Sequence, residues 1–146
     1  MFSWVEDGDL IYLKIDIFGQ YAARAYFTTR IGGVSSGAYA SLNMGLHVGD
    51  KKEDVLQNRK KIAASLGIDP GSFVAAEQVH GAETYVVTGQ EEGAGALDYH
   101  DSIPGVDALI TATAGLPLIS FYADCVPLFF LDPVKRVVAL AHAGWR

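Results

Sequence analysis

Three side chains of this sequence could act together on a metal ion: Cys125, His142 and His80. Cys125 is the only cysteine of the chain and lies where one apolar run ends and the next begins. Pro127, between those runs, cannot donate a hydrogen bond to a neighbouring strand. The pattern therefore predicts a strand, a corner and a second strand, with the thiol presented at the corner rather than packed inert in mid-strand.

The two histidines are expected at the ends of strands. His142 follows the apolar run 137–141 and shares one strand face with two of its aliphatic side chains. His80 ends the strand-like run 73–79, and Gly81 lets the chain turn sharply after it. One thiolate and two imidazoles leave a fourth tetrahedral position for water or substrate, a pattern typical of catalytic zinc sites.

Spacing alone does not decide between this hypothesis and simpler ones. Neither interval between the three residues matches a short metal-ligand motif, and a lone cysteine in an apolar context is more often a buried small hydrophobe. The same atoms would also serve a metal-free cysteine hydrolase, in which Cys125 attacks and His142 or His80 acts as the base.

Five segments, in this order, closely resemble the motifs of the YlmD/YfiH family. They are residues 28–35 (TTRIGGVS), 41–50 (SLNMGLHVGD), 78–81 (QVHG), 123–127 (ADCVP) and 142–146 (HAGWR). That family was long catalogued as laccase-like multicopper polyphenol oxidases and is now understood as purine nucleoside phosphorylases with adenosine deaminase side activity. The resemblance implies that His80, Cys125 and His142 are metal ligands, with zinc as the metal and copper as the alternative.

The resemblance also implies purine nucleosides and phosphate as substrates. In phosphorolysis, phosphate attacks the ribose anomeric carbon as the base leaves, and Arg30 and Arg146 are the candidate anion contacts. Asp124 or Asp107 is the candidate for proton transfer. Adenosine deamination would take place at the purine C6 beside Cys125 and the two histidines. The predicted catalytic set is therefore Asp124, Cys125, Arg30 and Arg146.

Two further hypotheses stay open at this stage. The first is copper-dependent polyphenol oxidation, as the older family label implies, although four histidines are few for several copper clusters. The second is a metal-binding fragment without turnover. Family members continue well beyond the HAGWR motif, whereas this sequence stops at Arg146. We therefore expect residues 1–146 to be a single domain that is the N-terminal part of a longer one.

Composition restricts the class of protein. A hydrophobic content of 50% with 19% charged residues is ordinary for a globular chain, and a net charge of −6 disfavours nucleic acid as a partner. A single cysteine excludes an internal disulfide. The first residues lack the basic start of a secretion signal, and the apolar stretch 116–131 is interrupted by Asp124 and too short for a membrane span. These features predict a cytoplasmic protein.

The periodicity predicts an α+β fold of mixed β-sheets with flanking helices. The expected strands are 10–18, 23–28, 73–80, 83–88, 106–112, 118–122, 127–131 and 137–141. One clear helix begins at a capping box formed by Asp50 and Glu53 and ends at Gly67.

The same apolar pattern predicts a buried strand face, a tight turn and a buried sheet. Ile11, Leu13 and Ile15 should form the buried face of their strand, and Gly81 with Ala82 should close a tight hairpin. The last three apolar strands should be buried on both faces. Because nothing in this sequence follows Arg146 to cover the last of them, we also expect self-association.

Overall fold

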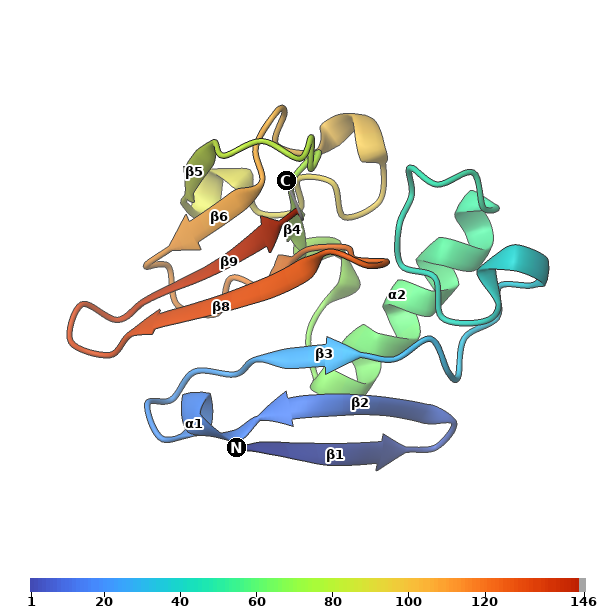
Figure 1. The fold of residues 1–146 in the computed structure, drawn as a ribbon, viewed down its shortest axis with the longest axis horizontal. Helices are drawn as coiled ribbons and strands as arrows, with labels where there is room; N and C mark the ends of the chain where they lie inside the picture. The colour runs from blue at the N-terminus through green and yellow to red at the C-terminus, as the bar shows by residue number, and fades with distance from the viewer. Residues whose placement is uncertain (145–146) are drawn as a thin grey trace. The chain divides into compact units, whose positions relative to one another are not determined.

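The computed structural model describes residues 1–144, and its contacts divide the chain into two compact units, Met1–Asp69 and Pro70–Arg146. We call them unit 1 and unit 2 and describe each by itself (Figure 1). Both contain β-sheets with few helices, so the α+β class with mixed sheets is confirmed. The expectation of a single domain over residues 1–146 stays a prediction.

Unit 1 is a three-stranded antiparallel sheet with one long helix. The strands are β1 (Phe2–Asp7), β2 (Leu10–Ile15) and β3 (Tyr26–Thr28), in that order across the sheet. The helices are α1 (Asp16–Gly19), a 3₁₀ turn at Gly37–Tyr39 and α2 (Lys52–Leu66). Leu10, Tyr12, Leu42 and Ile62 form its core.

The buried face of β2 is the opposite of the predicted one. Leu10 and Tyr12 are buried, whereas Ile11 is only half-buried. Tyr12 stacks edge-on against Tyr26, and its hydroxyl hydrogen-bonds to Ser65 of α2 at 3.0 Å. An aromatic ring with a polar tip can face the core when that tip finds a partner, and this outweighs the aliphatic alternation. The strand also ends at Ile15, where α1 begins.

Helix α2 agrees with the prediction at its end and differs at its start. Gly67 takes the left-handed conformation that ends the helix, with φ of 66°. The predicted capping box is wrong, because Lys51 is the N-cap and no side chain caps it. Asp50 instead accepts a hydrogen bond from the Lys51 N–H at 2.8 Å. Asn58 and Arg59 are buried in the helix, which the apolar pattern did not indicate.

Unit 2 holds two sheets. Strands β4 (Val74–Ala75) and β7 (Leu118–Ile119) form a parallel pair, and the larger sheet has the order β5-β6-β9-β8. The bounds of the latter are Thr84–Val87 for β5, Ala108–Thr111 for β6, Val126–Asp132 for β8 and Val137–Ala143 for β9. The 3₁₀ turns are Pro70–Ser72, Gly89–Glu91 and Tyr99–Asp101. The core cluster is Val74, Ala76, Val87, Ile103, Val106 and Leu109.

The predicted hairpin at Gly81-Ala82 is wrong. β4 pairs with β7 and β5 pairs in parallel with β6, so the segments before and after Gly81 belong to different sheets. The strand predicted over residues 73–80 shrinks to Val74–Ala75, and residues 77–80 are irregular. Local alternation could not show this, because the partners of both strands lie 20 or more residues further along the chain.

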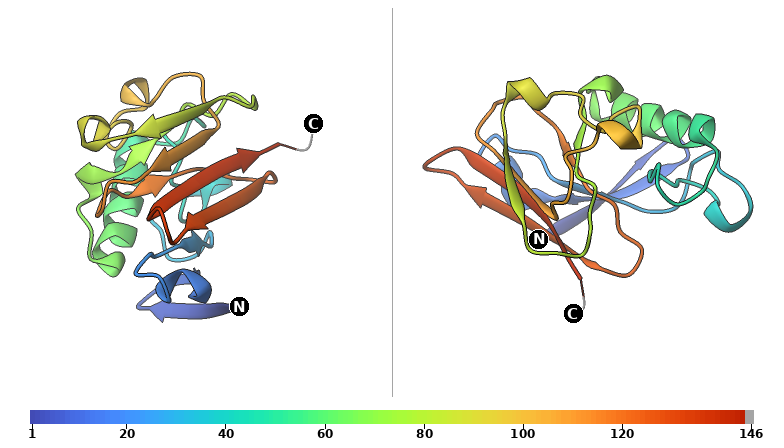
Figure 2. Two further views of the ribbon diagram at one scale, coloured as in Figure 1. Left: turned by 90° about the vertical axis from the view of Figure 1, so that its left-hand side faces the viewer. Right: turned by 90° about the horizontal axis from the view of Figure 1, so that it is seen from above.

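The antiparallel β8–β9 hairpin lies at one edge of the larger sheet (Figure 2). Pro127 lies in the edge strand β8, where its missing N–H is tolerated. The expected burial of the last three apolar strands on both faces is wrong, because β7 and most of β9 are only half-buried and alternate residues of β8 are exposed. Val126, Leu128 and Phe130 are 56%, 39% and 52% exposed and, two residues apart, share one face of the strand.

Candidate metal centre

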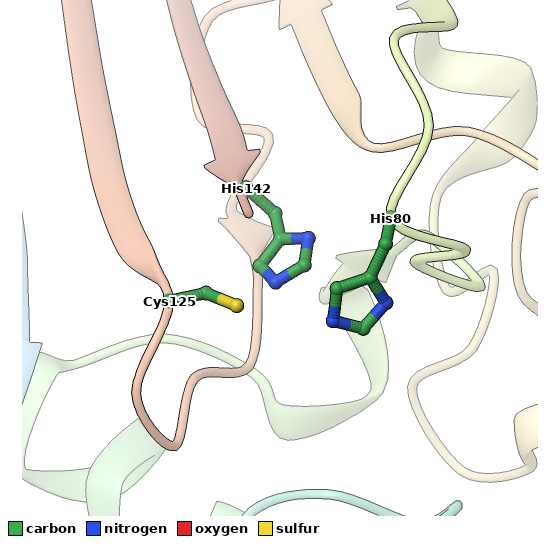
Figure 3. Close-up of side chains that lie close together, drawn as sticks. All are labelled: His80, Cys125 and His142. Carbon is green, nitrogen blue, oxygen red and sulfur yellow. The ribbon is translucent and has the colours of Figure 1, made fainter. Parts of the chain in front are cut away.

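Three segments of unit 2 bring the predicted metal ligands together. His80 lies in the irregular loop after β4, Cys125 in the bend just before β8, and His142 near the end of β9. One ligand atom from each lies within 4.8 Å of the other two. Figure 3 shows the thiol and both imidazole rings turned toward one another. The structure thus unites three residues that are far apart in the sequence.

The donor set and its spacing suit a first-row metal ion. Zinc binds imidazole nitrogen at about 2.0–2.1 Å and thiolate sulfur at about 2.3 Å, so tetrahedral ligand atoms lie about 3.4–3.6 Å apart. The limit of 4.8 Å here is about one ångström wider, a gap that small side-chain rotations can close. One thiolate with two imidazoles matches zinc, and copper accepts the same donors.

The β8–β9 hairpin places Cys125 beside His142. In the antiparallel register Pro127 lies opposite His142 and Val126 opposite Ala143. Cys125 comes immediately before this paired region, so its thiol emerges at the end of the hairpin where the imidazole lies. A shift of the register by one residue would turn His142 to the other face of the sheet.

A left-handed backbone turn presents His80. Its φ is 60°, a conformation that few residues other than glycine adopt, although histidine is among the more tolerant ones. Three successive backbone N–H groups, those of Val79, His80 and Gly81, donate to the Asp107 carboxylate at 3.2, 2.9 and 2.7 Å.

Asp107 also binds His142. Its Oδ1 lies 2.8 Å from His142 Nδ1, and its backbone carbonyl accepts the His142 N–H at 2.8 Å. The two side chains are 3% and 4% exposed. Burial acts to raise the pKa of Asp107, but the hydrogen bonds from His142 and the loop N–H groups outweigh it and lower that pKa. The carboxylate is therefore ionised at neutral pH and fully occupied by donors.

Gln78 links the His80 loop to the segment that leads to Cys125. Its amide donates to the Phe121 carbonyl and accepts from the Phe121 N–H, both at 2.8 Å. This pair of bonds imitates one step of a β-ladder between two irregular segments. The carboxylate of the preceding residue, Glu77, accepts a hydrogen bond from the Gly105 N–H at 3.0 Å.

The Cys125 thiol is half-buried and lies 3.9 Å from Asp124 Oδ1. Burial, followed by the negative charges of Asp124 and Asp107, raises the pKa of Cys125. A cysteine nucleophile needs the opposite shift, so its surroundings do not favour the cysteine-hydrolase alternative. A cation held by the same residues would favour the thiolate.

The aromatic ring of Tyr122 adds to the packing around His142. Its centroid lies 5.6 Å from the His142 imidazole, and its hydroxyl donates to the Ala141 carbonyl at 3.1 Å. The His80 and His142 rings themselves meet edge to face at 4.7 Å. Tyr122 was not among the predicted site residues, and no local sequence signal distinguishes it from an ordinary strand residue.

The other predicted site residues have different positions. Asp124 is exposed and directly precedes Cys125. Arg30 belongs to unit 1, where its guanidinium donates from Nε at 2.8 Å, and also from Nη2, to the Ala40 carbonyl. Arg146 lies outside the described residues. Within residues 1–144, His47 and His100 are not part of the cluster of ligands.

Within the same described range, no helix has the length and apolar character needed to cross a membrane.

Fold and site together define a mixed-sheet α+β protein with a candidate mononuclear centre of one thiolate and two imidazoles. The family model described as "Multi-copper polyphenol oxidoreductase laccase" matches residues 24–146. The chain belongs to this family, which is the family of YlmD and YfiH proteins.

Similar proteins and solved structures agree with this assignment. The chain is 50% identical over 124 residues to "Purine nucleoside phosphorylase YlmD" of Geobacillus stearothermophilus, covering 85% of this chain and 45% of that protein. It is 47% identical over 122 residues to the YlmD of Bacillus subtilis of the same description, covering 84% and 44%. The crystal structure of the hypothetical protein YfiH of Bacillus licheniformis superposes with a TM-score of 0.91 at 39% identity, covering 99% and 52%. This chain thus spans about half the length of the relatives it matches.

Proposed function

We propose that this chain carries the metal centre of a purine nucleoside phosphorylase that cleaves adenosine or inosine with phosphate and has adenosine deaminase side activity. The observation that carries the proposal is the convergence of His80, Cys125 and His142 within 4.8 Å. Relatives at 50% and 47% identity that bear the name purine nucleoside phosphorylase support the choice of substrates.

In the proposed reaction, a phosphate oxygen forms a bond to the ribose anomeric carbon while the bond to the purine nitrogen breaks. When bound, zinc or copper would supply Lewis-acid polarisation at its open coordination position. His80, Cys125 and His142 would hold that ion. Asp107 keeps the two imidazoles oriented, and its four donors favour this positioning role over proton transfer.

Two kinds of charged side chain complete the proposal. Arg30 and Arg146 would bind the phosphate, since a guanidinium offers five N–H donors and the Arg30 bonds to Ala40 use only two of them. Asp124, exposed beside Cys125, would transfer the proton that the leaving base requires. A cytoplasmic location, the exclusion of nucleic acid and self-association remain predictions.

A turnover assay with matched variants tests this proposal. The metal-loaded chain is incubated with inosine and phosphate, and then with adenosine alone, and the products are separated by chromatography. We expect free base and ribose phosphate in the first case and inosine with ammonia in the second. Cys125→Ser should lose both activities together with its metal, whereas His47→Ala, a histidine of unit 1 outside the cluster, should keep the metal.

Copper-dependent phenol oxidation is the second candidate, because the matching family model carries that description. In residues 1–144 only one group of three or more ligating side chains lies close enough to share an ion, whereas a multicopper oxidase requires several copper sites. The copper-loaded chain should therefore oxidise phenols poorly. Phenol turnover that exceeds nucleoside turnover would reverse the proposal.

A further inference from the structure

We propose that Asp107 is the positioning residue of the metal centre: it fixes both imidazole ligands at once, and the metal affinity depends on its being a carboxylate. This inference rests on the metal centre proposed above. It concerns a side chain that lies just before β6 and contributes no ligand atom to the cluster.

Asp107 determines which ring nitrogen of His142 is available to a metal ion. Its Nδ1 lies 2.8 Å from Asp107 Oδ1, in a pair that is almost completely buried. Both oxygens of Asp107 already accept backbone N–H groups, so Oδ1 acts as an acceptor toward His142 as well and the imidazole carries its proton on Nδ1. The lone pair of Nε2 is then free for a metal ion. Carboxylates that orient ligating histidines in this way raise their basicity and set their tautomer.

Asp107 also holds the loop that carries His80, the other imidazole. Asp107 accepts the backbone N–H groups of Val79, His80 and Gly81, and these bonds hold the left-handed turn that presents the His80 ring. A non-glycine residue in that conformation is strained unless its surroundings stabilise it. The same carboxylate thus links the loop that carries one imidazole to the side chain of the other.

An amide side chain cannot replace the carboxylate of Asp107. Four donors converge on Asp107: His142 Nδ1 and the His80 N–H on Oδ1, and the Val79 and Gly81 N–H groups on Oδ2. Asparagine has only one acceptor oxygen, and its NH₂ group would face two donors in either orientation. Asp107→Asn keeps the size of the side chain but opposes donors to donors at a buried position.

Cobalt binding tests the proposal without reference to turnover. Co²⁺ is titrated into the metal-free chain, and the thiolate-to-cobalt absorption reports coordination by Cys125. We expect Asp107→Asn to weaken the affinity about 10–100-fold, the range seen when a carboxylate behind a ligating histidine is removed. Equal affinity and equal spectra in the wild type and the variant would overturn the proposal.

Thr111→Val, in the strand that follows Asp107, is the matched control for loss of a buried hydrogen bond. Thr111 is 1% exposed, and its hydroxyl donates to the Val87 carbonyl at 2.8 Å without reaching the ligand cluster. We expect this variant to lose stability but to bind Co²⁺ within about twofold of the wild type, since effects at separate sites are independent. A loss of affinity as large as that of Asp107→Asn would mean that Asp107 has only a structural role.

A second measurement needs no variant and so does not depend on Asp107→Asn folding. Nitrogen-15 NMR of the metal-free wild type reports which ring nitrogen of each histidine is protonated. We expect the His142 proton on Nδ1, and a proton found on Nε2 instead would contradict the proposal. If the wild type binds no Co²⁺ at all, the proposed function fails; if it binds Co²⁺ and the variant binds equally well, only the role of Asp107 fails.

Discussion

In each unit of this protein, one buried polar side chain forms hydrogen bonds to segments that are distant in the sequence. In unit 1 it is Asn58 of α2, which is completely buried; its amide accepts the Val34 N–H and donates to Ser35 Oγ and to the carbonyls of Ser41 and Asn43. In unit 2 it is Asp107, which accepts three backbone N–H groups and the imidazole of His142.

The difference lies in the chemistry of the partners. Asn58 faces both donors and acceptors, so a neutral amide satisfies them and the result is a fixed loop. Asp107 faces donors only, which calls for an anion, and one of those donors belongs to a candidate metal ligand. A buried amide is thus sufficient to hold backbone, whereas a buried carboxylate can also orient an imidazole, as it does behind metal-ligating histidines.

The largest expected effect is that of removing a ligand. His80→Ala and His142→Ala should each weaken zinc binding roughly 100-fold or more, since losing a ligand should cost at least as much as losing its supporting carboxylate. His47→Ala and His100→Ala provide controls of the same residue type, because neither belongs to the cluster. Competition titration with a chromophoric chelator measures all four, and equal affinities across the set would refute the assignment of ligands.

Replacing Asn58 should lower the free energy of unfolding without changing the affinity for zinc. Asn58→Ala should lower the free energy of unfolding by about 3 kcal/mol, because each buried group left without a partner costs about 1–3 kcal/mol. Zinc affinity, measured where the variant is folded, should stay within about twofold of the wild type. A loss of affinity comparable to that of Asp107→Asn would remove the distinction between the two residues.

A smaller effect is expected from Gln78. Gln78→Ala removes both hydrogen bonds to Phe121 and so loosens the segment that leads to Cys125, while the bonds from Asp107 to the His80 loop remain. We expect zinc affinity to fall about threefold to tenfold, below the effect of removing a carboxylate that touches a ligand. Isothermal titration calorimetry measures the change, and unaltered binding would show that the link to Phe121 does not position the thiol.

The smallest effect concerns the acid sensitivity of unit 1. Burial acts to raise the pKa of Asp50, but hydrogen bonds from Asn43, Ser35 and the Lys51 N–H outweigh it and lower that pKa from its ordinary value of 3.8. A lowered carboxyl pKa contributes stability that is present above the ordinary value and is lost as the pH falls below it.

Asp50→Asn should therefore make the free energy of unfolding depend less on pH below the ordinary carboxyl pKa of 3.8. Near neutral pH the dependence should be unchanged. Urea unfolding at a series of pH values, followed by circular dichroism, measures both slopes. Identical slopes for the two proteins would show that Asp50 does not contribute to the acid sensitivity.

The three candidate ligands were named from the sequence together with the family resemblance, whereas Asp107 was named only for proton transfer and its place behind His142 was not foreseen. Cys125 before Pro127 and His142 at the end of an apolar run have local signatures, and the structure places them in a bend and a strand as expected. Asp107 has none, since its role arises from the pairing of β6 with β9 and from a loop 26 to 28 residues earlier. The failed hairpin at Gly81 has the same cause, because non-local parallel pairing leaves no trace in local alternation.

X-ray absorption at the zinc edge of the zinc-loaded chain tests the central claim most directly, because it identifies the donor atoms around the ion. Coordination by Cys125, His80 and His142 predicts one ion per chain, with one sulfur at about 2.3 Å and two imidazole nitrogens at about 2.0–2.1 Å. A shell of light atoms without sulfur, or a chain that retains no zinc, would contradict the account.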